Sequence, residues 1–381
     1  MKDLKQKALK EHEKYHGKLE IISKKPLNNR DGLTLFYTPG VAFPCKEIEK
    51  NPLDAYKYTM KSNTVAVITD GSAVLGLGNI GALAGLPVME GKCALFKEFG
   101  GVNAFPICLG TQDTEEIISV VKNISLVFGG INLEDISAPR CFEVEERLKA
   151  ELDIPVFHDD QHGTAIVCLA GLINGLKVTG KKKEKVKIVI SGAGAAGMAI
   201  CKLLLKYGFK NIILLDSVGT IYEGRSELNI YKEKIAKETN REKIVGGLAE
   251  AISGADVFIG VSKPNILTAK MVKTMNEKSM VFAMSNPDPE ITPEEAKKGG
   301  AFIIATGRSD YPNQINNVLA FPGIFKGALK YGAKKITDDM KIASAEALAK
   351  IVKKPSREKI IPGVFEKGIS DKIALAVKKY C

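Results

Sequence analysis

The stretch KIVISGAGAAG, residues 187–197, joins a short apolar run to three glycines spaced as Gly-x-Gly-x-x-Gly. The run predicts a buried strand, and the segment after it predicts a helix. The first glycine permits a tight turn, the second lets backbone approach a pyrophosphate, and the third allows close helix–strand packing. The start of the helix would attract phosphate groups. The pattern predicts a dinucleotide site formed by Gly192, Ala193, Gly194, Ala195, Ala196 and Gly197.

A second apolar run, residues 211–215, ends at Asp216, 19 residues after Gly197. An acid at this position in a dinucleotide-binding fold hydrogen-bonds the adenosine ribose. Asp216 would repel a 2′-phosphate, which favours NAD as the cofactor. Four downstream residues could instead neutralise such a phosphate and leave NADP open: Ser217, Arg225, Lys232 and Lys234.

The rest of the chain alternates predicted strands and helices, which is typical of parallel α/β layers. We expect a charged helix in residues 1–20 and mostly loops in 21–45. Strands are predicted at 64–69, 92–96, 104–108, 125–128, 186–190, 211–215, 256–261, 279–284 and 301–304. Helices are predicted at 54–62, 81–87, 113–122, 139–150, 164–176, 198–207 and within 338–381. The fold class is α/β, with an N-terminal α/β substrate and metal domain (1–160). A doubly wound Rossmann domain with C-terminal helices (161–381) follows it.

Composition supports a globular protein and excludes several classes. Of 381 residues, 45% are hydrophobic, so there is ample material for a core. The seven cysteines form no Cys-x-x-Cys pair, and neither a signal peptide nor an apolar run of membrane-spanning length is evident. We therefore expect reduced thiols in a cytoplasmic protein. The net charge of +11 comes from scattered lysines, so neither nucleic acid nor membrane is an expected partner.

Two acidic groups follow apolar runs and could bind a metal. Glu134 and Asp135 come after residues 125–133, and Asp160 comes after residues 154–157. Acids at the carboxyl ends of parallel strands lie where α/β proteins bind ligands. Because all three offer oxygen, they favour Mg²⁺ or Mn²⁺ over zinc. His158 and His162 lack a third nitrogen or sulfur ligand nearby, so we expect them to pack near the site.

Lys92 is the only lysine in the mostly apolar segment 88–95, where we predict a strand. Burial and a nearby divalent cation would lower the pKa of its ammonium group towards that of a useful base. A lysine that extends to solvent from a strand edge explains the residue equally well. A base, a hard-metal site and a dinucleotide site in one chain together indicate metal-assisted redox chemistry.

Several segments give the chain a specific resemblance to the malic enzymes, in their short prokaryotic form. The resemblance covers nearly the whole chain. The segments that carry it are 36–42 (FYTPGVA), 69–81 (TDGSAVLGLGNIG), 89–92 (MEGK), 132–135 (NLED), 157–164 (FHDDQHGT), 285–287 (SNP), and Asn316-Asn317 before Phe321-Pro322-Gly323.

The resemblance implies a role for each candidate residue. Glu134, Asp135 and Asp160 would bind the metal, with Lys92 as general base and Tyr37 as general acid. Tyr37, Lys92, Asn286 and Asn317 would contact the substrate. Ser262 and Asn286 would join Asp216 and the glycine loop at the cofactor. Asn265 stands where we expect glycine, and the arginine that follows the Asp-Gly pair in the large eukaryotic enzymes is absent at Ser72-Ala73. A homodimer or larger homo-oligomer is also implied.

The resulting hypothesis is oxidative decarboxylation of L-malate to pyruvate and CO₂, with reduction of NAD(P) and a divalent metal. Decarboxylation of oxaloacetate is expected as well. The nearest alternative is malolactic conversion, in which the hydride returns to pyruvate and lactate leaves. A catalytically silent nucleotide-binding regulator and a nucleic-acid binder are the rivals from other classes.

Overall fold

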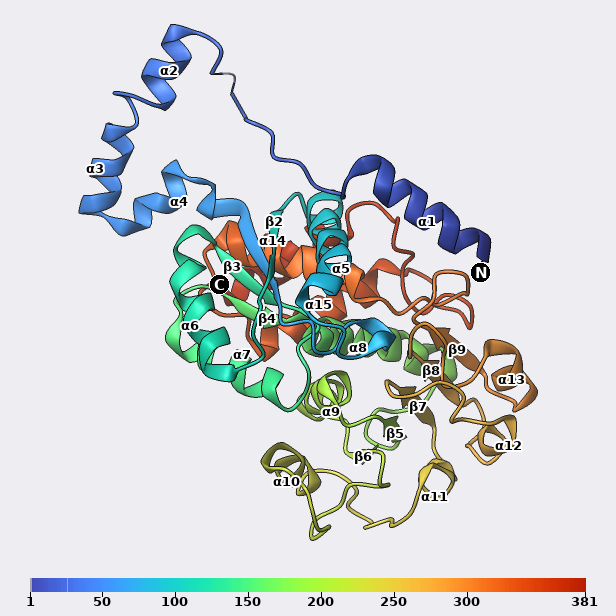
Figure 1. Ribbon diagram of the computed structural model, residues 1–381. Helices are drawn as coiled ribbons and strands as arrows, with labels where there is room; N and C mark the ends of the chain where they lie inside the picture. The colour runs from blue at the N-terminus through green and yellow to red at the C-terminus, as the bar shows by residue number, and fades with distance from the viewer. Residues whose placement is uncertain (1, 26) are drawn as a thin grey trace.

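The computed structural model describes residues 2–25 and 27–381 and has an α/β architecture with two parallel sheets (Figure 1). The first sheet has the order β2-β1-β3-β4. Its strands are β1 (Thr64–Thr69), β2 (Asn103–Cys108), β3 (Gly130–Leu133) and β4 (Val156–His158). Every residue of β1 is buried, as expected for a central strand of a parallel sheet. The helices of this half are α5 (Ala82–Leu95), α6 (Thr114–Ile124) and α7 (Arg140–Glu151).

The second sheet has the order β6-β5-β7-β8-β9, and all of its pairs are parallel. Its strands are β5 (Lys187–Ser191), β6 (Asn211–Leu215), β7 (Val257–Gly260), β8 (Met280–Ala283) and β9 (Ile303–Thr306). Strand order reverses on either side of β5, and α/β proteins bind ligands at such a switch point. Its helices are α9 (Ala195–Tyr207), α10 (Ile230–Ala236), α11 (Leu248–Ile252), α12 (Ala269–Val272) and α13 (Pro293–Lys298).

Helix α8 (Asp159–Thr179) joins the two sheets and packs against α9 and α15 (Asp338–Ile351). By length and composition it could cross a membrane, and the sequence analysis found no such run. However, 67% of its most apolar window is buried inside the protein, which is typical of a core helix. The helix starts five residues earlier than predicted, so Asp159 and Asp160 lie in its first turn.

The C-terminal helices α14 (Phe321–Tyr331) and α16 (Ile369–Val377) return to the first half of the chain. Phe321 and Phe325 of α14 contact the ring of Phe96, with ring centroids 4.7 and 5.3 Å apart. Aromatic contacts at these distances bury large apolar areas. The prediction that the C-terminal region is helical and packs on the body is confirmed.

Two predicted strands were wrong. Residues 92–96 belong to helix α5 and its continuation, where Met89, Lys92, Cys93 and Phe96 are buried at a spacing of three to four residues. That spacing is helical, and the apolar residues between the buried positions concealed it. Residues 125–127 form a 3-10 turn, and the strand follows at 130–133. A short apolar run does not distinguish strand from helix without its tertiary partners.

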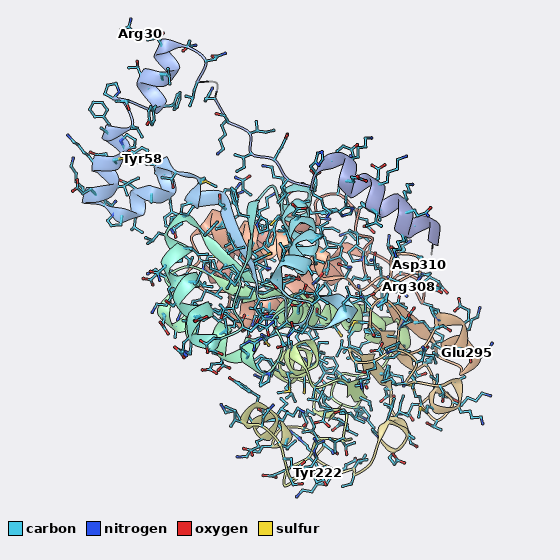
Figure 2. All side chains as sticks on the ribbon, viewed as in Figure 1. Arg30, Tyr58, Tyr222, Glu295, Arg308 and Asp310 are labelled. Carbon is cyan, nitrogen blue, oxygen red and sulfur yellow. The ribbon has the colours of Figure 1, made fainter. Side chains whose placement is uncertain are left out.

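The N-terminal region forms a helix and an arm. Helix α1 (Lys2–Tyr15) confirms the charged helix predicted in residues 1–20, and its side chains from residue 4 onward are exposed. Residues 30–58 carry α2 (Arg30–Phe36), α3 (Ala42–Lys50) and α4 (Ala55–Tyr58), so the predicted loop region is partly helical. Figure 2 shows this arm standing away from the body between the labels Arg30 and Tyr58. Its apolar side chains are exposed, among them Leu35 and Phe43 at 66% and 71%.

Candidate active site

Three carboxylates meet at the carboxyl edge of the first sheet. Glu134 and Asp135 follow β3, and Asp160 lies in the first turn of α8 directly after β4. One oxygen of each lies within 4.8 Å of the others. Asp135 has a φ of 54°, a left-handed conformation that aspartate tolerates better than most residues. Its backbone N–H donates to Asp160 Oδ2 at 2.8 Å, which ties the two ligand-bearing turns together.

Lys92 lies against the same cluster from helix α5. Its Nζ is 2.8 Å from Glu134 Oε1 and 2.6 Å from Asp159 Oδ2, and all three side chains are buried. The ammonium group also lies 4.3 Å from the centroid of the Phe321 ring. The sequence analysis anticipated the proximity of lysine and acids but placed the lysine on a strand.

The pKa of Lys92 differs from the expectation. Burial alone lowers it, but the carboxylates of Asp159, Glu134 and Asp160 outweigh burial and raise the pKa above its ordinary value. Burial raises the pKa of Glu134 well above its usual range, and the neighbouring aspartates add to that increase. The carboxylates of Asp159, Glu134 and Asp160 outnumber the single ammonium group beside them, so the cluster has excess negative charge. The donor set, three convergent oxygens with surplus negative charge, fits a hard divalent cation.

Asp159 and Asn317 complete the surroundings of Lys92. Asn317 Nδ2 donates to Asp159 Oδ2 at 2.5 Å, the same oxygen that accepts from Lys92. Gly163 must lack a side chain here, since a Cβ would lie 1.9 Å from Asp159 Oδ1. The sequence analysis selected Asn317 but gave Asp159 no role of its own. A metal-binding role was predicted only for its neighbour Asp160, and the contact with Lys92 in the folded chain is what distinguishes the two acids.

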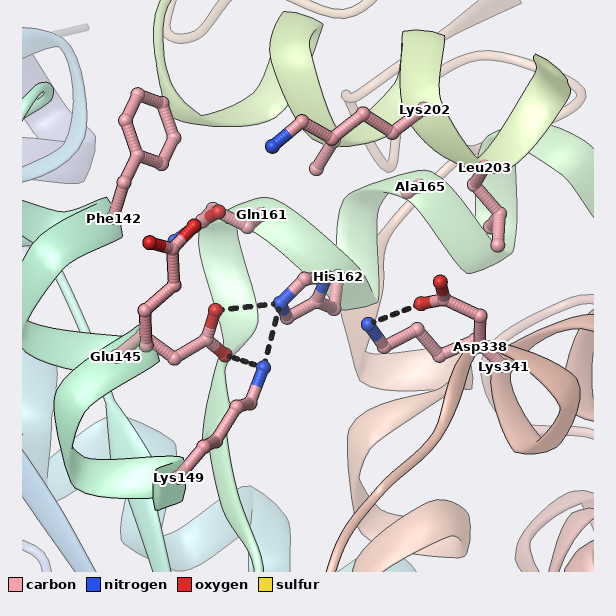
Figure 3. A pocket seen from close by; sticks show the side chains of 12 residues that line it. Phe142, Glu145, Lys149, Gln161, His162, Ala165, Lys202, Leu203, Asp338 and Lys341 are labelled. Atoms are coloured by element: carbon pink, nitrogen blue, oxygen red, sulfur yellow. Dashed lines mark hydrogen bonds and ion pairs between the residues drawn. The ribbon is translucent and has the colours of Figure 1, made fainter. Parts of the chain in front are cut away.

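Glu145 of α7 anchors the start of helix α8. Its Oε1 accepts the backbone N–H of His158 at 2.9 Å, and its Oε2 lies 2.8 Å from His162 Nε2. Figure 3 shows these groups with Lys149 and Lys341 around a cavity of about 200 Å³. Burial lowers the pKa of His162 to about 3, and Lys341 and Lys149 contribute, although Glu145 opposes the shift. His162 is therefore neutral near pH 7, and it contacts Glu145 and the ring of Phe157.

The glycine loop has the predicted geometry. It connects β5 to α9, and Gly192 has a φ of 113°, which favours glycine. A Cβ on Gly197 would lie 1.7 Å from the Gly192 carbonyl oxygen, so helix and strand approach too closely for any side chain. A cavity of about 510 Å³ borders the loop and extends to Asp216, Lys232 and Ser262. The cradle and the cavity fit a dinucleotide.

Asp216 follows β6, and two cations neutralise it. Its Oδ2 lies 2.5 Å from Arg225 Nη2 and 2.6 Å from Lys232 Nζ. Burial would raise the pKa of Asp216, but bonds from Arg225, Lys232 and the backbone N–H of Val218 hold that pKa well below its usual range. Arg225 and Lys232, two of the four residues that could neutralise a 2′-phosphate by the sequence, thus pair with Asp216 itself.

The loop that carries Asn286 touches the first half of the chain. A Cβ on Gly76 would lie 2.3 Å from the Asn286 carbonyl oxygen, so the glycine-rich segment 70–81 packs directly on this loop. Ser262, in the loop after β7, has its Oγ 3.2 Å from Ser191 Oγ at the end of β5. Asn265 has a φ of 57°, which explains why glycine was expected there.

Tyr37 does not join this cluster within the chain. It ends α2 on the projecting arm, its side chain is 64% exposed, and the body that carries Lys92 lies elsewhere (Figure 1). The other candidate residues for metal and substrate lie on the body. The geometry of one chain therefore assembles the lysine, the acids and Asn317, but not the tyrosine.

Comparison with known proteins gives matches over nearly the whole chain. Residues 16–149 match the family model described as malic enzyme, N-terminal domain, and residues 161–381 match malic enzyme, NAD binding domain. The bifunctional malic/malolactic enzyme of Bacillus subtilis is 54% identical over 379 residues, 99% of this chain and 92% of that protein. The NAD-dependent malic enzyme of Geobacillus stearothermophilus is 56% identical over 363 residues, 95% of this chain and 76% of that protein.

A solved structure agrees in fold. The crystal structure of an NAD-dependent malic enzyme from Thermotoga maritima matches with a TM-score of 0.94 and 50% identity. The match covers 97% of this chain and 98% of that one.

Proposed function

Because this chain belongs to the malic enzyme family, we propose that it oxidatively decarboxylates L-malate to pyruvate and CO₂ and reduces NAD(P). The observation that carries the proposal is Lys92, held by Asp159 and Glu134 beside two further convergent carboxylates. A silent nucleotide-binding regulator would need no buried lysine in an acid cluster. We assign residues 1–160 to substrate and metal and residues 161–381 to the nucleotide.

Glu134, Asp135 and Asp160 would hold Mg²⁺ or Mn²⁺. A divalent cation there acts as a Lewis acid on the substrate oxygens and stabilises negative charge that develops on them. Its positive charge would also offset the carboxylates that now raise the pKa of Lys92. The lysine would then reach the neutral form that a general base requires.

Lys92 accepts the proton of the malate C2 hydroxyl while the hydride on C2 passes to the nicotinamide. Asp159 and Asn317 orient its amine, since Asp159 Oδ2 accepts from both side chains. Loss of the C4 carboxylate as CO₂ leaves its bonding electron pair on C3. As CO₂ leaves, Lys92 returns its proton to the C2 oxygen, which gives the enol of pyruvate. Tyr37 then donates a proton to C3 while Lys92 takes the enol proton back and the carbonyl forms, and transfer of that proton from Lys92 to Tyr37 restores both side chains. Asn286 and Asn317 hold the substrate carboxylate and the nicotinamide end.

Tyr37 would enter the site from a second copy of the chain. The arm that carries it exposes large apolar side chains of α2 and α3, which a monomer would leave in water: Leu33, Leu35, Phe36, Tyr37 and Phe43. Exposed apolar surface of this kind marks an interface. In a two-fold dimer each arm can reach the partner's body, and the same contact occurs twice. We therefore propose a homodimer, or a larger assembly built on it, with shared sites.

The cofactor is NAD, with NADP accepted as well. Asp216 can hydrogen-bond the adenosine ribose of NAD. Because Arg225 and Lys232 already neutralise this acid, its repulsion of a 2′-phosphate is weakened. Either cation could instead pair with that phosphate. An acid that is already paired with two cations discriminates less between NAD and NADP than an unpaired acid would.

The decisive test follows absorbance at 340 nm with L-malate, Mn²⁺ and either NAD or NADP, with pyruvate and lactate measured in the same sample. Reduced cofactor in step with pyruvate supports the proposal and ranks the two cofactors. Neither product, despite measurable nucleotide binding, contradicts it. Oxaloacetate supplied with Mn²⁺ and no nucleotide tests the expected decarboxylation of that acid.

Malolactic conversion is a second candidate, because the name of the Bacillus subtilis relative includes that activity. The same residues support it if pyruvate stays bound while the hydride returns. Lactate without net reduced cofactor would identify it. We place the protein in the cytoplasm, consistent with seven cysteines that are all unpaired.

A further inference from the structure

Glu290 is a fully buried carboxylate in the nucleotide-binding half, and the mechanism above does not use it. Its Oε1 accepts the backbone N–H of Ser262 at 2.9 Å, and its Oε2 accepts that of Ser285 at 3.1 Å. Ser262 lies in the loop after β7, and Ser285 lies in the loop after β8. One carboxylate therefore joins the two loops that carry Ser262 and Asn286.

The backbone around Glu290 is built to admit this side chain. A Cβ on Gly260 would lie 2.4 Å from the Glu290 carboxyl carbon, so the last residue of β7 has to be glycine. The Glu290 carbonyl accepts the N–H of Leu267, and the Pro289 carbonyl accepts that of Asn265. Backbone hydrogen bonds therefore link the two loops in addition to the bonds that the carboxylate accepts.

The charge of Glu290 has no cationic partner. Among the residues that the structure describes, no lysine, arginine or histidine lies within ion-pair distance of it, whereas Asp216, which lines the cavity beside the glycine loop, has two cations. Burial raises the pKa of Glu290, and the backbone N–H groups of Ser262 and Ser285 oppose that increase. A buried charge without a counter-ion is costly, so something else in the working protein should compensate it.

The position of Glu290 indicates which positive charge could compensate its carboxylate. Asp216 follows β6 and the glycine loop follows β5, so the adenosine half of a dinucleotide lies over these two strands. The nicotinamide half then extends over the loops after β7 and β8, which Glu290 joins. An oxidised nicotinamide ring carries one positive charge, and the reduced ring is neutral.

We propose that Glu290 holds these two loops in place for the nicotinamide half and that its unpaired negative charge favours the oxidised cofactor over the reduced one. It is a positioning residue with an electrostatic effect, and it takes no proton in the reaction. The inference rests on the proposed function only in that the nucleotide is NAD(P).

Two substitutions together separate the effect of the charge from that of the hydrogen bonds. Glu290→Gln removes the charge at nearly unchanged size and keeps only one of the two acceptors, because its amide NH₂ faces the other backbone N–H. Glu290→Asp keeps the charge but is one methylene shorter, so it cannot reach both loops. The dissociation constant of NADH is measured by its fluorescence with the full-length protein and no malate, and that of NAD⁺ by displacement of NADH. Glu294→Gln, an exposed acid on α13, is the matched control for loss of one charge nearby.

In Glu290→Gln we expect the NAD⁺ constant to rise about 5- to 10-fold more than the NADH constant, since only the oxidised ring carries a positive charge that the carboxylate attracts. In Glu290→Asp both constants rise together and their ratio stays at the wild-type value. The control leaves both unchanged. Equal rises in Glu290→Gln, or a changed ratio in Glu290→Asp, overturn the inference. Failure of malate turnover would count against the proposed function and leave this ratio measurable.

Discussion

A hybrid dimer tests whether Tyr37 acts in the site of the partner copy. Lys92→Ala removes the base on the body, and Tyr37→Phe removes the acid on the arm. Each homodimer should lose about 10²–10⁴-fold in turnover, since a positioned acid or base contributes that much. Hybrids made from the two variants carry both defects in one site and none in the other. Because an isologous dimer has two such sites, the purified hybrid should show about half of wild-type activity.

The assay uses co-expression with two different affinity tags, purification over both columns, and the 340 nm rate with L-malate and Mn²⁺. The matched control is the hybrid of Lys92→Ala with Asp160→Asn. Both of these residues lie on the body, so both sites of that hybrid are damaged and no recovery follows. A purified Lys92→Ala/Tyr37→Phe hybrid as inactive as its parents would show that Tyr37 serves its own chain, and the shared-site model would be wrong.

Three further predictions concern the metal, the cofactor and acid stability. Asp160→Asn should abolish Mn²⁺ binding in calorimetry and leave NADH binding unchanged, and Mn²⁺ bound at wild-type affinity would reject the metal assignment. Lys232→Met should raise the KM for NADP about 10-fold and that for NAD less than about twofold, since only NADP carries the 2′-phosphate; equal effects on both would refute the pairing. Burial lowers the pKa of His162 to about 3 in the native state. Below about pH 6.5 the unfolded chain therefore binds a proton that the native state does not, and the free energy of unfolding falls as the pH is lowered. Between pH 7 and pH 5 this lowers the free energy of unfolding by about 2 kcal/mol. Urea unfolding at the two pH values should show that His162→Gln loses about 2 kcal/mol less than the wild type over the same interval.

Local patterns predicted much of the nucleotide half. Gly192 and Gly197 stand at fixed spacing because the tight turn needs the positive φ of Gly192 and the close helix–strand contact leaves no room for a Cβ on Gly197. Asp216 was found because an acid at the end of the second strand follows from the same topology. The first half was predicted less well, since helix α5 is apolar on more than one side and its period of 3.6 residues is weak in the sequence.

The candidate site residues also fall into two groups, those that the sequence alone predicted and those whose contacts only the tertiary structure shows. Residue types and order alone determined the α/β class, the glycine loop and the three acids proposed as oxygen ligands, because these depend on short-range spacing and on the carboxyl ends of parallel strands. Only the tertiary structure decided that Asp159 and not Asp160 holds Lys92, that Arg225 and Lys232 neutralise Asp216, and that Tyr37 lies outside its own chain's site. The first two depend on which side chains meet in the folded chain, across 67 residues for Lys92 and Asp159 and across 9 and 16 residues for Asp216 and its two cations. The third depends on the direction in which the arm leaves the body, and none of the three leaves a periodic signal in the sequence.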